Sequence, residues 1–388
     1  MRIGIDARFI GPQGTGLGKY TEKLITNLAK IDKRNTYIIF LKKDNWHFLK
    51  IEAKNFHKRL ADVKWYSIFE QIKLPGIFVK EKLDLLHIPH FNVPLFYKPP
   101  GLSLGNIFGL HERSEFKGKF VVTIHDLIHH HFSETSTTAK NLIVFKLKRI
   151  AYKFVISSAV KRSSKILVPS NFVKDEIIKY YKISPPKIIV TYEAAEEEYF
   201  VNRQRSSVKG QVSLLYVGNA YPHKNLPRLL DAFKILTTHY SLPATHLVLV
   251  CPRDIFWQRL EGEIKARNLE GKVRLIGYMR VGELAKLFAN ASTYVFPSLS
   301  EGFGIPGLNA MAAGLPVVCS DIPVLHEVYG EAAIYFNPHD PKDIAKKIKK
   351  ALTDNQFREK LIDSGYKQVN KFSWQRMARE TLKVYESV

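Results

Sequence analysis

Short apolar stretches alternate along the chain with longer stretches in which apolar residues recur at helical spacing. The first apolar stretch covers residues 2–6, and the helical pattern after it places Tyr20, Leu24 and Leu28 on one face. Strands that alternate with helices in this way are typical of parallel sheets. Further strands are predicted at residues 37–41, 85–88, 120–124, 166–169, 187–191, 212–217, 245–250, 273–276, 293–296, 316–319 and 333–335, and further helices at 226–236, 282–289, 341–353 and 374–387.

A polar stretch, residues 201–211, interrupts this pattern, and we predict it to be a linker between two domains. The alternation of strands and helices starts again after it. A length of 388 residues with 45% hydrophobic content is enough for two separate cores. The predicted fold class is therefore α/β, with two doubly wound, Rossmann-like domains facing a central cleft. The first domain is predicted at residues 1–200 and the second at 211–372.

The composition narrows the class of protein further. Ordinary apolar content and 12% aromatic residues exclude a mainly disordered chain. The two cysteines, Cys251 and Cys319, exclude a disulfide scaffold and indicate a reducing compartment. No apolar run reaches about 18 residues, and residues 1–9 predict a strand, so we expect neither a membrane-spanning helix nor a signal peptide. The net charge of +23 attracts phosphates, nucleic acid or anionic lipid without selecting among them.

A glycine-rich turn follows the first predicted strand. Gly14, Gly16 and Gly18 precede Lys19 at the start of a predicted helix. Glycine lets the backbone approach a ligand closely, and a helix start presents free N–H groups that suit an anion. The spacing matches neither the dinucleotide fingerprint nor a P-loop, so an anion-binding loop and a tight structural turn both stay open.

His125 and Asp126 follow the strand predicted at residues 120–124. Open α/β sheets bind ligands at the carboxyl ends of their strands, so we interpret His125 as a polar side chain of a ligand site, with Asp126 orienting it or lying beside it. A structural loop histidine is the alternative. Three more histidines follow at residues 129–131, but no Cys, Asp or Glu set at metal-ligand spacing accompanies them, and no metal is expected.

Two segments of the second half also follow predicted strands. Lys224 lies near a helix start in a Pro-containing loop after Gly218, where a lysine can supply a point charge for a diphosphate; a solvated lysine is the alternative. The stronger candidate is residues 296–318, in which a strand leads into a glycine-rich loop and a helix of small residues. Glu301 lies in this loop, where a carboxylate can accept hydrogen bonds from sugar hydroxyls; an exposed surface charge is the alternative.

The segment E-G-F-G-I-P-G-L-N-A, which begins at Glu301, resembles the E-G-F-G-x-P-x-x-E-A signature of retaining glycosyltransferases with the GT-B fold, glycosyltransferase family four. The stretches G-N-A-Y-P-H-K-N-L, T-G-L-G-K-Y-T, V-T-I-H-D-L and V-P-S-N-F and the closing F-S-W also resemble this family, especially its mannosyltransferase-like members. The resemblance covers nearly the whole chain in the family's order, with a looser match between residues 42 and 120.

The resemblance implies a set of site residues. Those assigned to catalysis are His125 and Glu301, which would contact the donor sugar, and Lys224, which would neutralise the diphosphate leaving group. The implied donor-binding residues are Gly16, Gly18, Asn219, Tyr278, Ser298, Gly302, Phe303, Gly304, Ile305 and Asn309, with Tyr278 near the base. The implied acceptor-binding residues are Lys19, Tyr20 and Asp126. The family also implies that the helix at 373–388 packs back on the first domain and that no cofactor or divalent metal is needed.

Two positions depart from the family pattern. Asn309 stands where the family has a second glutamate that binds the nucleotide ribose, and asparagine can form hydrogen bonds there but lacks the charge. Asn219 stands where many members have an arginine, so the diphosphate would depend more on Lys224, helix N-termini and loop amides.

The implied reaction moves a hexose, with mannose from GDP-mannose as the best guess, from a nucleotide-diphosphate sugar to a glycan or lipid-linked acceptor in cell-surface polysaccharide or glycolipid synthesis. The anomeric configuration would be retained by front-face attack. A non-catalytic sugar-nucleotide-binding relative and a GT-B epimerase or phosphorylase are the alternatives. Specific nucleic-acid binding is not expected, because no recognition module with base-stacking aromatics is visible.

Residues 135–173 contain eight basic and no acidic side chains, with apolar residues interleaved. This pattern predicts either a basic amphipathic helix against an anionic membrane surface or an internal packing helix with a solvated lysine face. The expected location is cytoplasmic and, in the first case, peripheral on the inner face of the cytoplasmic membrane.

Overall fold

The computed structural model describes residues 1–11, 14–95, 97, 119–132, 142–200, 212–240, 242 and 245–388. They form two units: unit 1 comprises Met1–Leu127, Ala139–Glu193 and Trp374–Val388, and unit 2 comprises Ile128–Thr138 and Ala194–Ser373. The predicted linker at 201–211 lies outside the described residues. The structure differs from the predicted boundary at residue 200, because helix α3 (Ile128–His131) and residues 194–200 group with unit 2.

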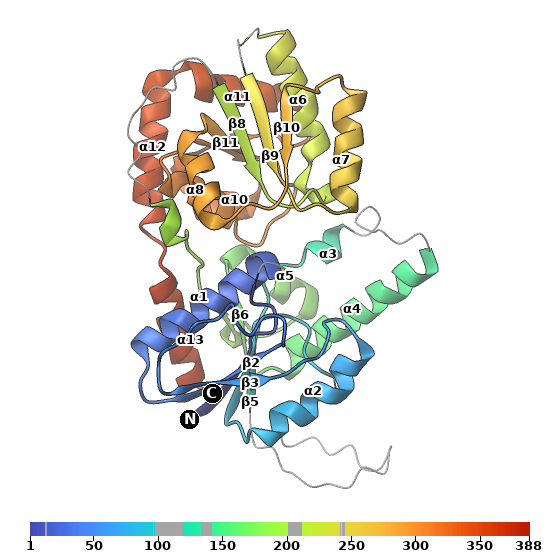
Figure 1. Cartoon of the computed structure of the whole chain (residues 1–388), viewed down its shortest axis with the longest axis vertical. Coiled ribbons are helices and arrows are strands. Elements are labelled where there is room, and N and C mark those ends of the chain that lie inside the picture. Colours follow the sequence, from blue (N-terminus) through green and yellow to red (C-terminus); the bar gives the residue numbers. More distant parts are fainter. Residues whose placement is uncertain are drawn as a thin grey trace. The chain divides into compact units, whose positions relative to one another are not determined.

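Unit 1 is built on a seven-stranded parallel sheet, of which Figure 1 labels β2, β3, β5 and β6. The order of its strands is β3-β2-β1-β4-β5-β6-β7. The strand order reverses between β1 and β4, as in doubly wound folds. The strands are β1 (Arg2–Asp6), β2 (Thr36–Leu41), β3 (Phe56–Leu60), β4 (Leu85–Ile88), β5 (Lys119–Thr123), β6 (Lys165–Val168) and β7 (Ile188–Val190). The helices are α1 (Thr15–Ile31), α2 (Ile68–Lys80), α4 (Leu142–Arg162), α5 (Asn171–Tyr181), α13 (Trp374–Glu386) and the short η2 (Pro185–Lys187), with α13 packed against α1.

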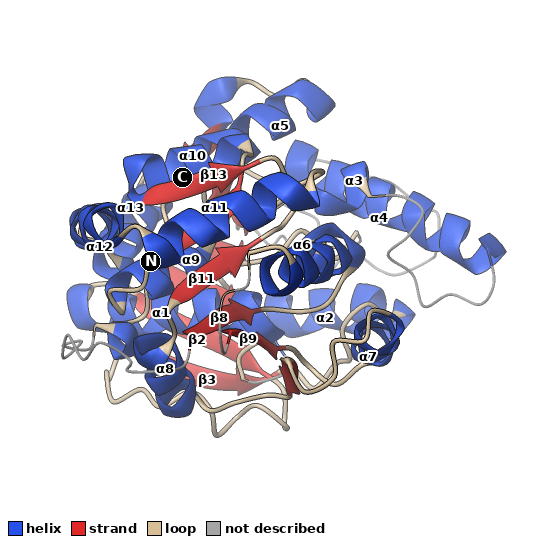
Figure 2. Ribbon diagram, turned by 90° about the horizontal axis from the view of Figure 1, so that it is seen from above, coloured by secondary structure: helices blue, strands red, loops and turns tan. Residues whose placement is uncertain are grey.

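Unit 2 contains a six-stranded parallel sheet with the order β10-β9-β8-β11-β12-β13, and its strand order reverses between β8 and β11 (Figures 1 and 2). The strands are β8 (Val212–Val217), β9 (Thr245–Val250), β10 (Val273–Ile276), β11 (Thr293–Phe296), β12 (Val317–Ser320) and β13 (Ala333–Phe336). The helices are α3, α6 (Leu226–Thr238), α7 (Ile255–Ala266), α8 (Val281–Asn290), α9 (Ile305–Ala312), α10 (Pro323–Tyr329), α11 (Pro341–Thr353), α12 (Asn355–Val369), and the short η3 (Glu197–Tyr199), η4 (Pro222–Lys224) and η5 (Gly330–Ala332).

The central strands are buried on both faces, which explains why they form nearly continuous apolar runs in the sequence. Strand β3, which was not predicted, lies at the edge of its sheet and has the polar sequence F-H-K-R-L with mostly half-buried and exposed side chains. Its pairing with β2 is therefore not visible in the apolar pattern. Within the described residues, no helix is long and apolar enough to cross a membrane.

A buried ionic network in unit 1, also not predicted, fixes the start of α2. Arg8 Nη2 donates to Asp6 Oδ2 at 2.8 Å and to Glu70 Oε1 at 2.7 Å. The other oxygen of Glu70 accepts hydrogen bonds from Tyr66 N at 2.7 Å and Asn92 Nδ2 at 2.6 Å. Arg8, Asp6 and Glu70 are each at most 2% exposed. Since buried charges must be paired to be tolerated, Glu70 has to face the sheet, which sets the rotation of α2 about its axis.

Candidate active site

Lys224 and Glu301 meet at the reversal of strand order in unit 2. Lys224 lies in η4, shortly after β8, and Glu301 follows β11, the neighbouring parallel strand. Carboxyl ends of parallel strands lie at one edge of the sheet, and the reversal point at this edge is where such folds bind ligands. Lys224 Nζ lies 2.6 Å from Glu301 Oε1, and the two side chains are only 13% and 10% exposed. The structure thus brings these two predicted site residues into direct contact.

The turn that carries Lys224 is fixed by hydrogen bonds on both sides. The His223 carbonyl oxygen accepts from Leu299 N in the loop after β11 at 2.7 Å. Asn225 adopts a left-handed conformation at φ 60°, and its amide donates to the Pro338 carbonyl oxygen at 2.7 Å. Burial, with smaller effects from Lys224 and His129, lowers the pKa of His223 to about 3. His223 is therefore neutral near pH 7, and Lys224 is the positive charge of this turn.

The glycine-rich loop after Glu301 leads directly into α9. Gly304 has φ 105°, and a Cβ atom there would lie 2.5 Å from the hydroxyl of Tyr329, which donates to the Gly304 carbonyl oxygen. Only glycine fits this combination of backbone conformation and close approach. Gly304 is the N-cap and provides no side-chain cap. Pro306 has no N–H and Gly307 N donates to the Gly304 carbonyl oxygen at 3.1 Å, so Ile305 N is the N–H group at the start of α9 that can donate to an anion.

Three of the remaining predicted donor residues of this loop are buried: Ser298, Gly302 and Phe303. Ile305, at the first position of α9, is half-buried. The Ser298 hydroxyl is fully buried and forms no hydrogen bond with any residue that the structure describes. A buried hydroxyl without a partner is costly, so Ser298 is a strong candidate for a ligand contact.

Asn309, the departure from the family pattern, has a structural partner. It lies on α9, is 5% exposed, and its Oδ1 accepts a hydrogen bond from Glu196 N at 3.0 Å. The amide therefore anchors the segment that enters η3. Its predicted contact with the nucleotide ribose stays a prediction.

Asn219 and Tyr278 lie at the same edge of the sheet as Lys224. Asn219, like Lys224, follows β8, whereas Tyr278 follows β10. Asn219 is half-buried after β8, and its Oδ1 accepts from Tyr221 N at 3.3 Å. Tyr278 follows β10 and is 69% exposed. Since β10 is two strands from β8 and strands are about 4.8 Å apart, roughly 10 Å of sheet separates the ends of these strands.

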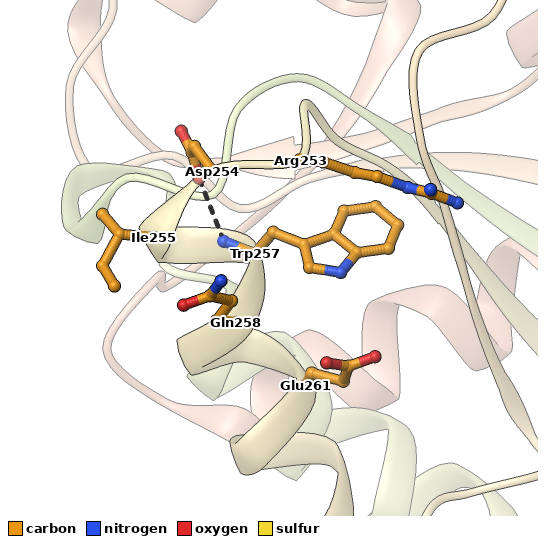
Figure 3. Close-up of a pocket in the computed structure, with 6 residues that line it drawn as sticks. All are labelled: Arg253, Asp254, Ile255, Trp257, Gln258 and Glu261. Atoms are coloured by element: carbon orange, nitrogen blue, oxygen red, sulfur yellow. Dashed lines mark hydrogen bonds between the residues drawn. The ribbon is translucent and has the colours of Figure 1, made fainter.

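A cavity of about 460 Å³, which the sequence did not predict, lies at the start of α7, after β9 (Figure 3). It is lined by Arg253, Asp254, Ile255, Trp257, Gln258 and Glu261. The Arg253 guanidinium lies 5.5 Å from the centre of the Trp257 ring, and Asp254 caps α7 by accepting from Trp257 N. A second cavity, of about 330 Å³, shares Asp254 and Ile255 with the first and is also lined by His223. The one visible signal was an Arg-Asp pair after a strand, which alone indicates only a helix cap.

His125, the predicted catalytic histidine of unit 1, follows β5 and is 21% exposed at its side chain. Its Nδ1 lies 3.1 Å from Glu193 Oε1, and its Nε2 lies 3.2 Å from the Pro89 carbonyl oxygen. The ring of Tyr20 contacts it edge-on, with centroids 4.6 Å apart. These contacts fix the imidazole at the carboxyl end of the sheet. Asp126, beside it, is half-buried.

The prediction that Tyr20 contacts an acceptor does not agree with its position. Tyr20 is 1% exposed, and its hydroxyl lies 3.2 Å from Thr123 Oγ1 in the core. The same threonine lies 2.8 Å from Nε2 of His87, whose Nδ1 lies 2.5 Å from the Tyr385 hydroxyl on α13. Tyr20 therefore lies in the core and packs edge-on against the ring of His125, which helps to orient that ring. Lys19 is half-buried, and its Nζ lies 3.6 Å from Glu22 Oε2.

The predicted glycines at the start of α1 have different roles. A Cβ atom at Gly18 would lie 2.3 Å from the Phe9 carbonyl oxygen, and one at Gly14 only 1.6 Å from it. At Gly16 there is nothing within 4 Å. Gly14 and Gly18 are thus needed for the close packing of α1 on the loop after β1, whereas Gly16 leaves open space that a ligand can use.

Comparison with known proteins finds a match for the second half of the chain. Residues 200–368 match the model described as Glycosyl transferases group 1. Over 350 residues the chain is 27% identical to the O-antigen chain mannosyltransferase RfbU of Salmonella typhimurium, with 88% of each chain covered. Over 235 residues it is 34% identical to the O-antigen chain mannosyltransferase B of Escherichia coli, with 57% of this chain and 60% of that protein covered.

Solved structures confirm the predicted fold class. Sucrose-phosphate synthase from Thermosynechococcus elongatus matches with a TM-score of 0.75 at 18% identity, covering 100% of this chain and 98% of that one. WaaG, a glycosyltransferase involved in lipopolysaccharide biosynthesis, matches with a TM-score of 0.72 at 16% identity, covering 98% and 99%. The two parallel-sheet, Rossmann-like units are those of GT-B glycosyltransferase structures.

The two glycines of α1 give a matched test of packing against ligand access. We expect Gly18→Ala to destabilise the protein by about 1–3 kcal/mol, because the added methyl group meets a backbone oxygen. Gly16→Ala should be neutral or stabilising by up to about 1 kcal/mol, because it improves helix propensity in open space. Chemical denaturation measures both. Equal destabilisation by the two substitutions would contradict the distinction.

The buried His87 allows a test of how stability depends on pH. Burial, with a smaller effect from His125, lowers the pKa of His87 to about 3, from an ordinary value near 6.5 in the unfolded chain. The unfolded state therefore binds more protons between these values, and stability falls as pH falls through this window. Between pH 7 and pH 5 we expect His87 to contribute a loss of about 2 kcal/mol, which His87→Gln removes. Urea midpoints at both pH values measure this loss, with the exposed His57→Gln as control; an undiminished loss in His87→Gln would sink the assignment.

Proposed function

We propose that this protein is a glycosyltransferase that moves a mannosyl residue from a nucleotide-diphosphate sugar to a glycan or lipid-linked acceptor in the assembly of an O-antigen or similar cell-surface polysaccharide. The observation that carries the proposal is the Lys224–Glu301 contact at the strand-order reversal of the domain that matches Glycosyl transferases group 1. The names of the relatives, O-antigen chain mannosyltransferases, support mannose and the polysaccharide.

The chemistry of the step fits the charges at this site. Transfer breaks the bond between the anomeric carbon and the diphosphate oxygen, so negative charge develops on the leaving group. Lys224 and the N–H group of Ile305 at the start of α9 are fixed in place before the reaction and stabilise that charge at little reorganisation cost. In the free protein the Lys224 ammonium group is paired with the Glu301 carboxylate. In the complex the ammonium group pairs with the diphosphate of the donor, and the Glu301 carboxylate accepts hydrogen bonds from hydroxyls of the donor sugar.

We propose that the transfer retains the anomeric configuration by attack on the front face. The acceptor oxygen bonds to the anomeric carbon on the side from which the diphosphate leaves, and the acceptor proton passes to the departing phosphate oxygen. No protein nucleophile is needed in this scheme, and the positive charge comes from Lys224 and backbone amides, so we also propose that no divalent metal takes part. His125 would contact the donor sugar, as the family resemblance implies, with Glu193 and Tyr20 holding its ring.

A weak sugar-nucleotide-binding protein without activity is the second candidate, because Asn309 replaces the ribose-binding glutamate and is engaged with Glu196. A thermal-shift panel of GDP, UDP, ADP and TDP and their sugar conjugates separates the two. A ligand at about 100 times its dissociation constant adds ~2.7 kcal/mol of stability, which is readily detected. A selective shift by one base together with sugar transfer supports the enzyme; a shift without transfer supports the binding protein; no shift overturns the donor site.

Replacement of Lys224 tests the role of the ion pair in turnover. Lys224→Ala should lower kcat by at least about tenfold, equivalent to ~1.4 kcal/mol, because the leaving-group charge loses its side-chain partner. Lys234→Ala, at an exposed position on α6 of the same unit, is the matched control and should leave kcat unchanged. Unchanged turnover in Lys224→Ala would remove this residue from the mechanism.

A further inference from the structure

The first turns of helix α2 of unit 1 present three large apolar side chains to water. Ile68, Phe69 and Ile72 are 79%, 64% and 62% exposed, and Tyr66, directly before the helix, is 64% exposed. On the opposite side of the helix, the buried residues include a carboxylate, Glu70. A surface helix of a water-soluble unit normally has the reverse arrangement, and a contiguous exposed apolar patch of this kind marks an interaction surface.

The fold does not allow α2 to turn this face inward. Glu70 is bonded to Arg8, Tyr66 and Asn92 in the buried network, so rotation of the helix would leave charged groups without partners. Leu74 and Phe78, on the same side as Glu70, are fully buried in the core. The exposed face is therefore a built feature with a fixed direction.

The charges around the patch are positive. Within residues 64–82 the basic residues Lys64, Lys73, Lys80 and Lys82 are all exposed. The two acidic residues of this segment, Glu70 and Glu81, are both paired with arginines. Lys73 Nζ lies 5.4 Å over the ring of Phe69, with its stem along the apolar surface. Exposed apolar side chains on a helix that also carries exposed lysines are complementary to the hydrocarbon boundary and headgroups of an anionic bilayer.

Helix α4 lies near the start of α2, because the ring of Phe91 contacts both Tyr66, with centroids 6.4 Å apart, and Tyr152 of α4, with centroids 5.0 Å apart. Ile150 and Phe154, one turn apart, are 66% and 63% exposed, with the exposed Lys153 between them in the sequence. Ile156 of α4 and Leu74 of α2 belong to one core cluster, so the two helices pack on the same core (Figure 1). The sequence predicted either a membrane-facing helix or an internal packing helix within residues 135–173. In the structure α4 covers Leu142–Arg162, and residues 135–141 lie outside the described part of the chain.

We propose that the face formed by Tyr66, Ile68, Phe69 and Ile72 is a membrane-docking surface that lies in the interfacial region of an anionic phospholipid bilayer, and that the exposed Ile150 and Phe154 of α4 contribute to it. The apolar side chains enter the headgroup and acyl boundary, and the surrounding lysines bind lipid phosphates. This surface is independent of the proposed donor site, because none of its residues belongs to that site.

Vesicle flotation tests the proposal directly with the full chain. The wild-type protein should float with vesicles of phosphatidylcholine and phosphatidylglycerol and much less with phosphatidylcholine alone. The triple variant Ile68→Ser, Phe69→Ser, Ile72→Ser should lose at least about tenfold in partitioning, because the inserted area is removed. Lys73→Gln with Lys80→Gln should lose at least about fivefold on anionic vesicles. Tyr180→Ser, an exposed aromatic on α5 of the same unit, is the matched control and should bind like wild type.

A conservative variant separates insertion from misfolding. Phe69→Trp should float like wild type, and its fluorescence should be quenched by brominated acyl chains. Wild-type protein that floats with neither vesicle, or a triple variant that floats like wild type, overturns the proposal. So does a dimer that dissociates in the triple variant while the vesicles bind nothing, because the face would then be a protein interface. Sugar transfer to a soluble acceptor should be unchanged in the triple variant, so loss of docking is distinguishable from failure of the proposed function.

Discussion

A lysine and a carboxylate that are both largely removed from water are stable only when they neutralise each other or meet a charged ligand, and this requirement shapes unit 2. Lys224 and Glu301 are 77 residues apart in the sequence and 2.6 Å apart in space. They meet because β8 and β11 are neighbouring parallel strands whose carboxyl ends share one edge. The hydrogen bond from Leu299 to His223 and the neutral state of His223 leave one positive charge at a fixed place. A nucleotide-diphosphate sugar has the phosphate and hydroxyl groups to replace each partner of this pair.

Unit 1 contains both a buried network of paired charges and exposed lysines on α2. Arg8, Asp6 and Glu70 are paired in the core and fix the direction of α2, whereas the lysines around α2 stay in water and give its apolar face a positive border. The buried network thus determines which face of the helix is exposed. The net charge of +23, which by itself fits phosphates, nucleic acid or lipid, is in part accounted for by this face.

The sequence was sufficient for most strands and for the Lys224–Glu301 region, because buried parallel strands form apolar runs and the glycine-rich loop has a characteristic spacing. It was not sufficient where an element departs from its usual pattern. β3 is a polar edge strand, and α2 buries the carboxylate of Glu70 while Ile68 and Ile72 are exposed. Contacts between distant residues were also out of reach: Asn309 binds Glu196 across 113 residues, and only the position of the Phe9 carbonyl oxygen distinguishes Gly18 from Gly16.

The measurement that tests the central claim most directly is the affinity for GDP, without a sugar, of the wild type, Lys224→Met and Glu301→Gln by isothermal titration calorimetry. If the diphosphate replaces Glu301 as the partner of Lys224, Lys224→Met should weaken binding by at least about tenfold, since a charge-assisted contact is lost. Glu301→Gln should bind GDP as tightly as wild type or more tightly, because the ammonium group is released from its internal partner. Equal weakening by the two substitutions, or wild-type affinity in Lys224→Met, would contradict the account.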